Sequence, residues 1–263
     1  MNLLLTFFDG GTKRLTDSMG HNILLDSGAF SAYKRKEKVN FQEYCAFVKD
    51  PPFKVERYFM LDIIGDPIAT ERNLQIMLDK GLNPIPVFQR GQSLDKLYKL
   101  QEQFDLIGIG GVAGTNNRDE YLKFILQRPD INKRKLHLLG VLDMDLLKQY
   151  KPRSCDSTFI VDSGKFALIT YFNERENKVS RIGKQIVKNR RLMSKLPEEI
   201  QFGLLDSKGW IHTWKDPLCN MHFKASLHLF TNEICRRIPY TTIYIATDAY
   251  RMKYEIPKER GQL

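Results

Sequence analysis

The sequence predicts an α/β protein built as a (β/α)8 TIM-type barrel that becomes irregular in its C-terminal third. Short apolar runs alternate with amphipathic segments along most of the chain, which is typical of parallel βαβ units. About seven or eight such units in 263 residues fit a barrel better than an open doubly wound sheet. A Gly-x-Gly-x-x-Gly dinucleotide fingerprint is absent, because the glycines within 108–111 lack its spacing.

Apolar runs and helix punctuation set the expected elements. Strands are expected at residues 3–7, 23–25, 58–61, 85–88, 106–109, 136–139, 202–205 and 242–245. Helices are expected at 41–49, 67–80, 94–103, 118–127, 144–150, 182–196 and 221–237. Asp66 before Pro67 and then Gly81 mark the start and stop of one helix, and Ser93 is placed to cap the next. Residues 165–181 are expected to be an irregular excursion.

The composition is that of a folded protein. Hydrophobic residues make up 42% and charged residues 27% of the chain, which excludes disorder as its main state. No run reaches the ~20 apolar residues of a membrane span, and the apolar start at 3–8 is too short for a secretion signal. Four scattered cysteines indicate a reducing compartment rather than a disulfide framework. We therefore expect a cytoplasmic protein with no membrane partner.

The chain carries a large excess of positive charge. Lys and Arg number 41 against 31 Asp and Glu, which gives a net charge of +10. Counterion release rewards each phosphate contact, so a polyanion is the first partner to consider. The expected contacts are Lys34, Arg35, Lys36, Lys184, Lys188, Arg190 and Arg191. A solvated basic face is the alternative. We expect one barrel domain, 1–263, with a basic helical insertion around 165–200.

Polar residues follow the predicted strands at the point where each strand ends. The residues in these positions are Asp26, Asp62, Gln89, Gly110 and Gly111, and Asp156 comes shortly after the run Tyr150-Lys151-Pro152-Arg153. In a parallel barrel the strand ends meet at one mouth, where the chemistry lies. Carboxylates, an amide and exposed backbone suit a flat, hydrogen-bonding heterocycle and acid/base or covalent work. For any single aspartate a helix cap is the alternative, and Asp66 is better explained in that way.

These segments, in this order, resemble the tRNA-guanine transglycosylase (queuine tRNA-ribosyltransferase) superfamily. The stretches that carry the resemblance are Asp26-Ser27-Gly28-Ala29-Phe30, Leu61-Asp62, Val87-Phe88-Gln89, Gly110-Gly111-Val112-Ala113-Gly114, and Gly140-Val141 through Leu146-Leu147 followed by Asp156. The likeness is greater to the short viral members, which install 7-deazaguanines in DNA. If the protein is viral, the expected location is the host cytoplasm.

The resemblance implies a pentosyltransferase that replaces guanine in a polynucleotide with a 7-deazaguanine base such as preQ0. It makes Asp156 the nucleophile that holds the nucleotide covalently through C1′, and Asp26 the general acid/base. Asp162, in a second Asp-Ser-Gly, is the rival nucleophile. The residues implied in base binding are Asp62, Gln89, Gly110, Gly111, Ser27 and Phe30. DNA is the favoured acceptor, and tRNA is the second.

The chain departs from the family pattern in two places. The tRNA enzymes hold zinc through a Cys-x-Cys-x2-Cys arrangement and a distant His, and that spacing does not occur here. The nearest zinc candidates are Cys219, His222, His228 and Cys235, for which core or surface positions are the default. No cofactor is therefore expected. Ile63-Ile64 stand where the family has Glu-Cys, which removes a polar contact to the 7-substituent.

Three other functions stay open on the sequence alone. The first is a tRNA-guanine transglycosylase proper, with tRNA as acceptor. The second is a hydrolase acting on a nucleoside or another glycoside, which needs the same carboxylates but no basic face. The third is an inactive barrel that binds nucleic acid, against which the retention of Asp26, Asp62 and Asp156 argues.

Overall fold

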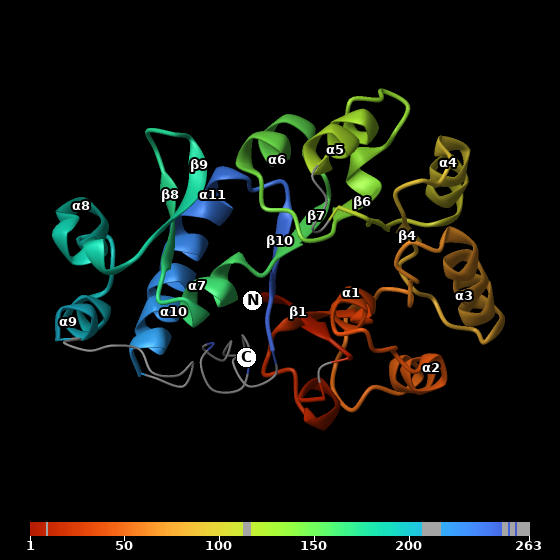
Figure 1. Cartoon of the computed structure of the whole chain (residues 1–263), viewed down its shortest axis with the longest axis horizontal. Helices are drawn as coiled ribbons and strands as arrows, with labels where there is room; N and C mark the ends of the chain where they lie inside the picture. The colour runs from red at the N-terminus through yellow and green to blue at the C-terminus, as the bar shows by residue number, and fades with distance from the viewer. Residues whose placement is uncertain (9, 113–116, 207–216, 249–251, 253–255, 257–263) are drawn as a thin grey trace.

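The computed structural model describes residues 1–8, 10–112, 117–206, 217–248, 252 and 256. It has an α/β fold in which helices lie around a curled, eight-stranded, wholly parallel sheet (Figure 1). A two-stranded hairpin and small helices lie to one side of that sheet, at the left in this view. Among the described residues, no helix has the length and apolar character needed to cross a bilayer.

The large sheet consists of short strands from along the whole chain. They are β1 (Asn2–Thr6), β2 (Asn22–Asp26), β3 (Arg57–Tyr58), β4 (Val87–Phe88), β5 (Ile107–Ile109), β6 (Leu136–Leu138), β7 (Ser154–Ser157) and β10 (Thr242–Ala246). Their order is β3-β2-β1-β10-β7-β6-β5-β4. The six strands expected before residue 140 and the one expected at 242–245 are confirmed, although several are shorter than expected. The strand β7 was not expected.

The two edge strands of this order approach each other. A parallel bridge pairs Phe59, just after β3, with Ile85, just before β4. The Met60 N–H donates to the Ile85 carbonyl at 2.9 Å, and the Ile85 N–H donates to the Tyr58 carbonyl at 2.8 Å. The curled sheet is therefore consistent with the expected TIM-like barrel.

Five of the helices around the sheet agree closely with the expected ones. They are α2 (Phe41–Lys49), α3 (Pro67–Asp79), α4 (Leu94–Gln103), α5 (Arg118–Leu126) and α6 (Met144–Tyr150). Two further helices, α1 (Ala29–Lys34) and α7 (Phe159–Lys165), were not expected. Asp66 caps α3 as expected, accepting from the Ala69 N–H at 2.9 Å, and Gly81 follows with φ of +73°. Ser93 stands before α4, but its side chain makes no capping hydrogen bond.

The sequence was wrong about the segment after α7. The excursion expected at 165–181 contains an antiparallel hairpin of β8 (Ile169–Asn173) and β9 (Lys178–Ile182). The single helix expected at 182–196 is instead a 3₁₀ helix (Lys184–Lys188) and the short α8 (Arg190–Met193). Asn189 separates the two, and its side chain caps α8 by accepting from the Leu192 N–H.

The strand expected at 202–205 is also wrong, because these residues lie in α9 (Glu198–Asp206). Ile200 and Leu204 are buried, whereas Phe202 and Leu205 are exposed. This spacing of buried residues is helical, and a four-residue apolar run does not reveal it by itself. The helix expected at 221–237 is confirmed as α10 (Pro217–Leu229), a π-helical segment (Phe230–Ile234) and α11 (Cys235–Arg237).

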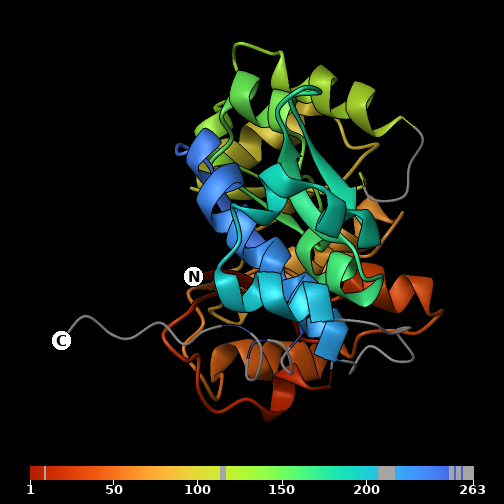
Figure 2. The same cartoon turned by 90° about the vertical axis from the view of Figure 1, so that its left-hand side faces the viewer.

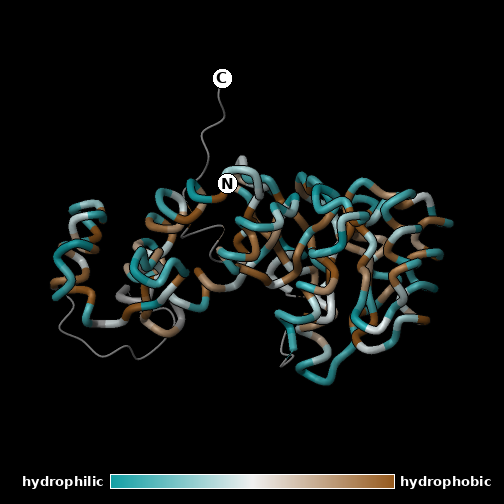
Figure 3. Tube along the Cα trace, turned by 90° about the horizontal axis from the view of Figure 1, so that it is seen from above, coloured by the Kyte–Doolittle hydropathy of each residue, from teal (hydrophilic) through white to brown (hydrophobic). Residues whose placement is uncertain are grey.

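The chain buries apolar side chains in two clusters. The larger lies in and around the curled sheet, from Leu3 to Ile256. The smaller joins the hairpin, α8, α9 and α10 through Ile169, Ile186, Leu192, Met193, Leu196, Ile200, Leu204, Ala225 and Leu229. Figure 2 brings this outlying part to the front, and Figure 3 shows hydrophobic residues in it as well as in the sheet. The hairpin and its helices therefore have a packed core of their own.

His21, in the loop before β2, gives the fold a predicted acid sensitivity. The side chain is 3% exposed, and neither ring nitrogen has a hydrogen-bond partner among the described residues. Burial lowers the pKa of His21 from 6.5 to about 4. Between these values the unfolded chain holds more protons than the folded one, so stability falls as pH falls. Below pH 4 the free energy of unfolding has lost about 3 kcal/mol, because each unit of pKa shift corresponds to about 1.4 kcal/mol.

Urea unfolding of the wild type and of His21→Leu at several pH values between 7 and 4 checks this prediction. As pH falls, we expect the free energy of unfolding to decrease more in the wild type than in the variant. The carboxylates titrate alike in both proteins, so they do not contribute to this difference. Parallel pH profiles would show that His21 is not the acid-sensitive group.

Candidate active site

Three aspartates lie at the carboxyl ends of strands in the sheet. Asp26 is the last residue of β2, Asp62 follows the Phe59 bridge, and Asp156 is the third residue of β7. Asp62 and Asp156 are buried, at 9% and 6% exposure, and Asp26 is half-buried. Burial, and then the negative charges of Asp62 and Asp156, raise the pKa of Asp26 from 3.8 to about 7. The charges of Asp62 and Asp156 therefore act on Asp26, as expected of carboxylates at one edge of the sheet.

A glycine turn shapes the backbone next to Asp26. The Gly28 N–H donates to Asp26 Oδ2 at 3.1 Å, and Gly28 has φ of +85°. A Cβ atom at this position would lie 2.3 Å from the Phe8 Cβ, so only glycine fits the turn. The Ser27 side chain is fully buried, and its Oγ accepts from the Ala29 N–H at 3.3 Å. Its hydroxyl oxygen is therefore hydrogen-bonded to the first residue of α1.

Asp62 and Gln89 form a buried pair. The Gln89 Nε2 donates to Asp62 Oδ2 at 3.0 Å and to the Ile63 carbonyl at 3.0 Å. Because both partners accept, the amide nitrogen faces them, and Gln89 Oε1 is buried with no partner among the described residues. Burial raises the pKa of Asp62 above its usual value, and the hydrogen bond from Gln89 opposes this rise. An unpaired buried acceptor of this kind suits a ligand N–H.

Gly110 and Gly111 follow β5, and the space around them requires glycine. A Cβ at Gly110 would lie 2.8 Å from Val87 Cγ1, and one at Gly111 would lie 2.8 Å from Arg90 Cβ. The Gly110 N–H already donates to the Phe88 carbonyl at 2.9 Å, so it is not a donor for a ligand. Ala113 and Gly114, from the same stretch of the resemblance, lie outside the described residues.

Asp156 is held by two donors that converge on one oxygen. Its Oδ1 accepts from the Gly140 N–H at 2.9 Å and lies 3.1 Å from Nε2 of His137. His137 belongs to β6, is fully buried, and was not predicted as a site residue. The available signal was a lone histidine between leucines, on the strand that leads to Gly140.

The first basic cluster lies at the end of α1, the helix that follows Asp26 in the chain. Lys34, Arg35 and Lys36 are exposed. The Lys34 ammonium lies 4.4 Å from the centre of the Phe30 ring, and the Arg35 guanidinium lies 5.3 Å from that of Phe8. One face of Phe30 is thus covered by a cation of the same helix.

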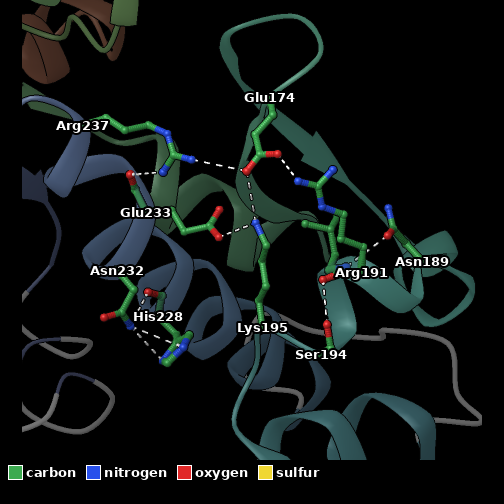
Figure 4. A network of polar contacts seen from close by, with 10 residues as sticks. Glu174, Asn189, Arg191, Ser194, Lys195, His228, Asn232, Glu233 and Arg237 are labelled. Carbon is green, nitrogen blue, oxygen red and sulfur yellow. Dashed lines mark hydrogen bonds and ion pairs between the residues drawn. The ribbon is translucent and has the colours of Figure 1, made fainter.

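The residues of the second basic cluster, Lys184, Lys188, Arg190 and Arg191, differ in their surroundings. Lys188 and Arg190 are exposed, and the Lys184 side chain lies outside the described part of the chain. Arg191 instead pairs with Glu174 in the turn of the hairpin. Glu174 also pairs with Arg237, at 3.4 Å, and with Lys195, at 3.7 Å. Lys195 in turn lies 2.5 Å from Glu233. Figure 4 shows these residues together. The charge of Arg191 is therefore partly neutralised within the protein.

The remaining candidates have other surroundings. Asp162 lies in α7, where its Oδ2 accepts from the Thr158 hydroxyl at 2.7 Å. His228 contacts Asn232, His222 is buried, and Cys235 is half-buried, while the Cys219 side chain lies outside the described residues. Within the described part, no His, Cys, Asp and Glu side chains group as metal ligands.

Comparison with known proteins adds no relative to this picture. No protein-family model matches the chain, and a search of curated proteins gave no match.

Proposed function

We propose that this protein is a guanine base-exchange enzyme, similar to the tRNA-guanine transglycosylases, that acts on a polynucleotide, with DNA favoured over tRNA. The observation that carries the proposal is the grouping of Asp26, Asp62 and Asp156, in which the pKa of Asp26 is raised to about 7. A carboxyl that is half ionised near neutral pH can give a proton in one step and take one in the next.

The proposal includes closure of the curled sheet into a (β/α)8 barrel across the bridge between Phe59 and Ile85. Closure would place the residues after β3 and β4 beside those after β2 and β7 at a single mouth. The effect of the Asp62 and Asp156 charges on Asp26 supports this arrangement.

In the first half-reaction Asp156 attacks C1′ of the target nucleotide. One carboxylate oxygen forms the C1′–O bond as the C1′–N9 bond breaks, and the bonding pair leaves with guanine. Asp26 gives its proton to the departing base. Carboxylates suit this step because cleavage of an N-glycosidic bond develops oxocarbenium character. The product is an aspartyl ester of the nucleic acid.

The second half-reaction reverses these roles with another base. Asp26, now ionised, takes the N9 proton of a 7-deazaguanine, whose nitrogen forms the new bond to C1′. The C1′–O bond breaks and its electron pair returns to Asp156. Two displacements retain the configuration at C1′ and give ping-pong kinetics.

The buried acceptors favour guanine as the base. Asp62 and Gln89 Oε1 together offer oxygens to the N1–H and amino group on the Watson–Crick edge of guanine. Adenine has no donor at N1 and would leave an acceptor unpaired. A guanine in a duplex would first be flipped out of its stack, at a cost of a few kcal/mol.

Base exchange with a labelled substrate tests the function and its acceptor. We expect radiolabelled guanine to enter duplex or single-stranded DNA on incubation with the protein, with little label in tRNA. Unlabelled 7-deazaguanine bases such as preQ0 should then chase the label out. The measurement is acid-precipitable radioactivity over time, with Asp156→Asn as the blank.

Two other results would redirect the proposal. Label in tRNA alone would make the protein a tRNA enzyme. No label in either polymer, together with cleavage of free nucleosides that does not depend on salt, would identify a hydrolase, because only a polyanionic substrate gives a steep salt dependence.

A further inference from the structure

His137 links β6 to the proposed nucleophile on β7. The two strands are neighbours, and His137 is in register with Ser154. The Nδ1 atom of His137 lies 2.8 Å from Ser154 Oγ, and its Nε2 atom lies 3.1 Å from Asp156 Oδ1. The ring is fully buried, with the Phe59 ring edge-on at 5.0 Å and the Tyr244 ring at 6.0 Å between centres. Rings on two sides and hydrogen bonds at both nitrogens hold the imidazole in place.

The hydrogen-bond partners also assign the ring proton. A carboxylate only accepts, so Nε2 carries the proton that is donated to Asp156. In the neutral ring Nδ1 is then the acceptor, and the Ser154 hydroxyl donates to it. Ser154 is thus a suitable partner for the tautomer that Asp156 requires.

Both donors to Asp156 use the same oxygen. The His137 Nε2 and the Gly140 N–H meet at Oδ1, and no hydrogen bond from a described residue reaches Oδ2. We propose that His137 is a positioning residue that presents Oδ2 to C1′ and stabilises the carboxylate when the ester breaks. This inference rests on the proposed function and adds a positioning residue to the same site.

The balance of charge at Oδ1 indicates which step depends on His137. In the covalent adduct Oδ2 is bonded to C1′, and Oδ1 is a neutral ester carbonyl. When the C1′–Oδ2 bond breaks, its electron pair returns to the carboxylate and Oδ1 gains negative charge. Hydrogen bonds to a charged oxygen are stronger than those to a neutral one. His137 therefore favours breakdown of the adduct more than its formation.

A matched pair of variants tests this asymmetry. His137→Met fills the site without a donor, whereas His137→Gln keeps an N–H near the position of Nε2. We expect His137→Met to break down its adduct about ten- to a hundredfold more slowly than the wild type, the range expected for a lost hydrogen bond to a charged group. The adduct should accumulate, and His137→Gln should restore breakdown to within a few fold.

The measurement is single-turnover formation of the protein–DNA adduct on denaturing gels, followed by a chase with free guanine. Nitrogen-15 NMR of the histidine ring gives a readout independent of activity. We expect a fixed Nε2–H tautomer for His137 in the wild type, because the Asp156 carboxylate only accepts. If His137→Met does not fold, His137→Leu carries the kinetic test.

The outcomes separate the inference from the function on which it rests. A wild type that forms no adduct at all refutes the proposed function. A wild type that forms an adduct, together with variants whose breakdown is unchanged or whose formation and breakdown slow equally, overturns the role of His137. An Nδ1–H tautomer in the wild type overturns it as well.

Discussion

Asp156→Asn is expected to abolish the covalent adduct with nucleic acid and to lower base exchange by at least about 10³-fold. An amide oxygen is a poor nucleophile toward C1′, and an amide does not carry the negative charge that the nucleophile must supply. The fold should survive, because the amide oxygen can still accept from the Gly140 N–H and from Nε2 of His137. Denaturing gels of the protein mixed with labelled DNA measure the adduct.

Asp162→Asn is the matched control for this substitution. Asp162 lies six positions further along the chain, and its side chain accepts from Thr158 on its own helix. We expect this variant to form the adduct at close to the rate of the wild type. If Asp162→Asn loses the adduct and Asp156→Asn keeps it, the nucleophile has been assigned to the wrong aspartate.

Asp26→Asn is expected to slow release of guanine by about 10²- to 10⁴-fold, the usual contribution of a positioned acid. In the wild type the rate of adduct formation should fall as pH rises through about 7, because the protonated carboxyl is the acid and its pKa lies there. The asparagine does not titrate, so the profile of the variant should lose this step. Single-turnover adduct formation between pH 5.5 and 8.5 measures both effects.

DNA binding by Asp26→Asn, and a second variant, Asp66→Asn, serve as controls for the role of Asp26. Filter binding to DNA should change by no more than a few fold, since the phosphate contacts we propose are made by other residues. Asp66→Asn retains a good N-cap for α3 and should keep the pH step of the wild type. A large loss of DNA binding in Asp26→Asn would contradict its acid/base role.

Sequence reasoning succeeded where local signals and the fold agreed. The helices at 41–49, 94–103 and 144–150 have the expected bounds, because each combines an amphipathic pattern with a clear start. The grouping of Asp26 with Asp62 and Asp156 followed from one rule, that parallel strands end at the same edge. No property of any single aspartate was needed for this prediction.

The failures have different physical causes. Pairing between β8 and β9 is a contact between segments, and the apolar run at 202–205 is equally compatible with a strand and with the buried side of α9. His137 was missed because its contact with Asp156 depends on the register of β6 with β7, which no local pattern contains. Arg191 looked like a free cation because Glu174 is distant in sequence.

The place of β10 between β1 and β7 has a consequence during protein synthesis. Roughly 90 residues separate Asp156 from the end of β10, so a ribosome needs about 5–20 s to supply them at ordinary speeds. Until then β7 lacks the neighbour that pairs with Asp156 itself. A nascent or prematurely terminated chain would thus contain Asp26, Asp62 and Asp156 without the strand that pairs with Asp156.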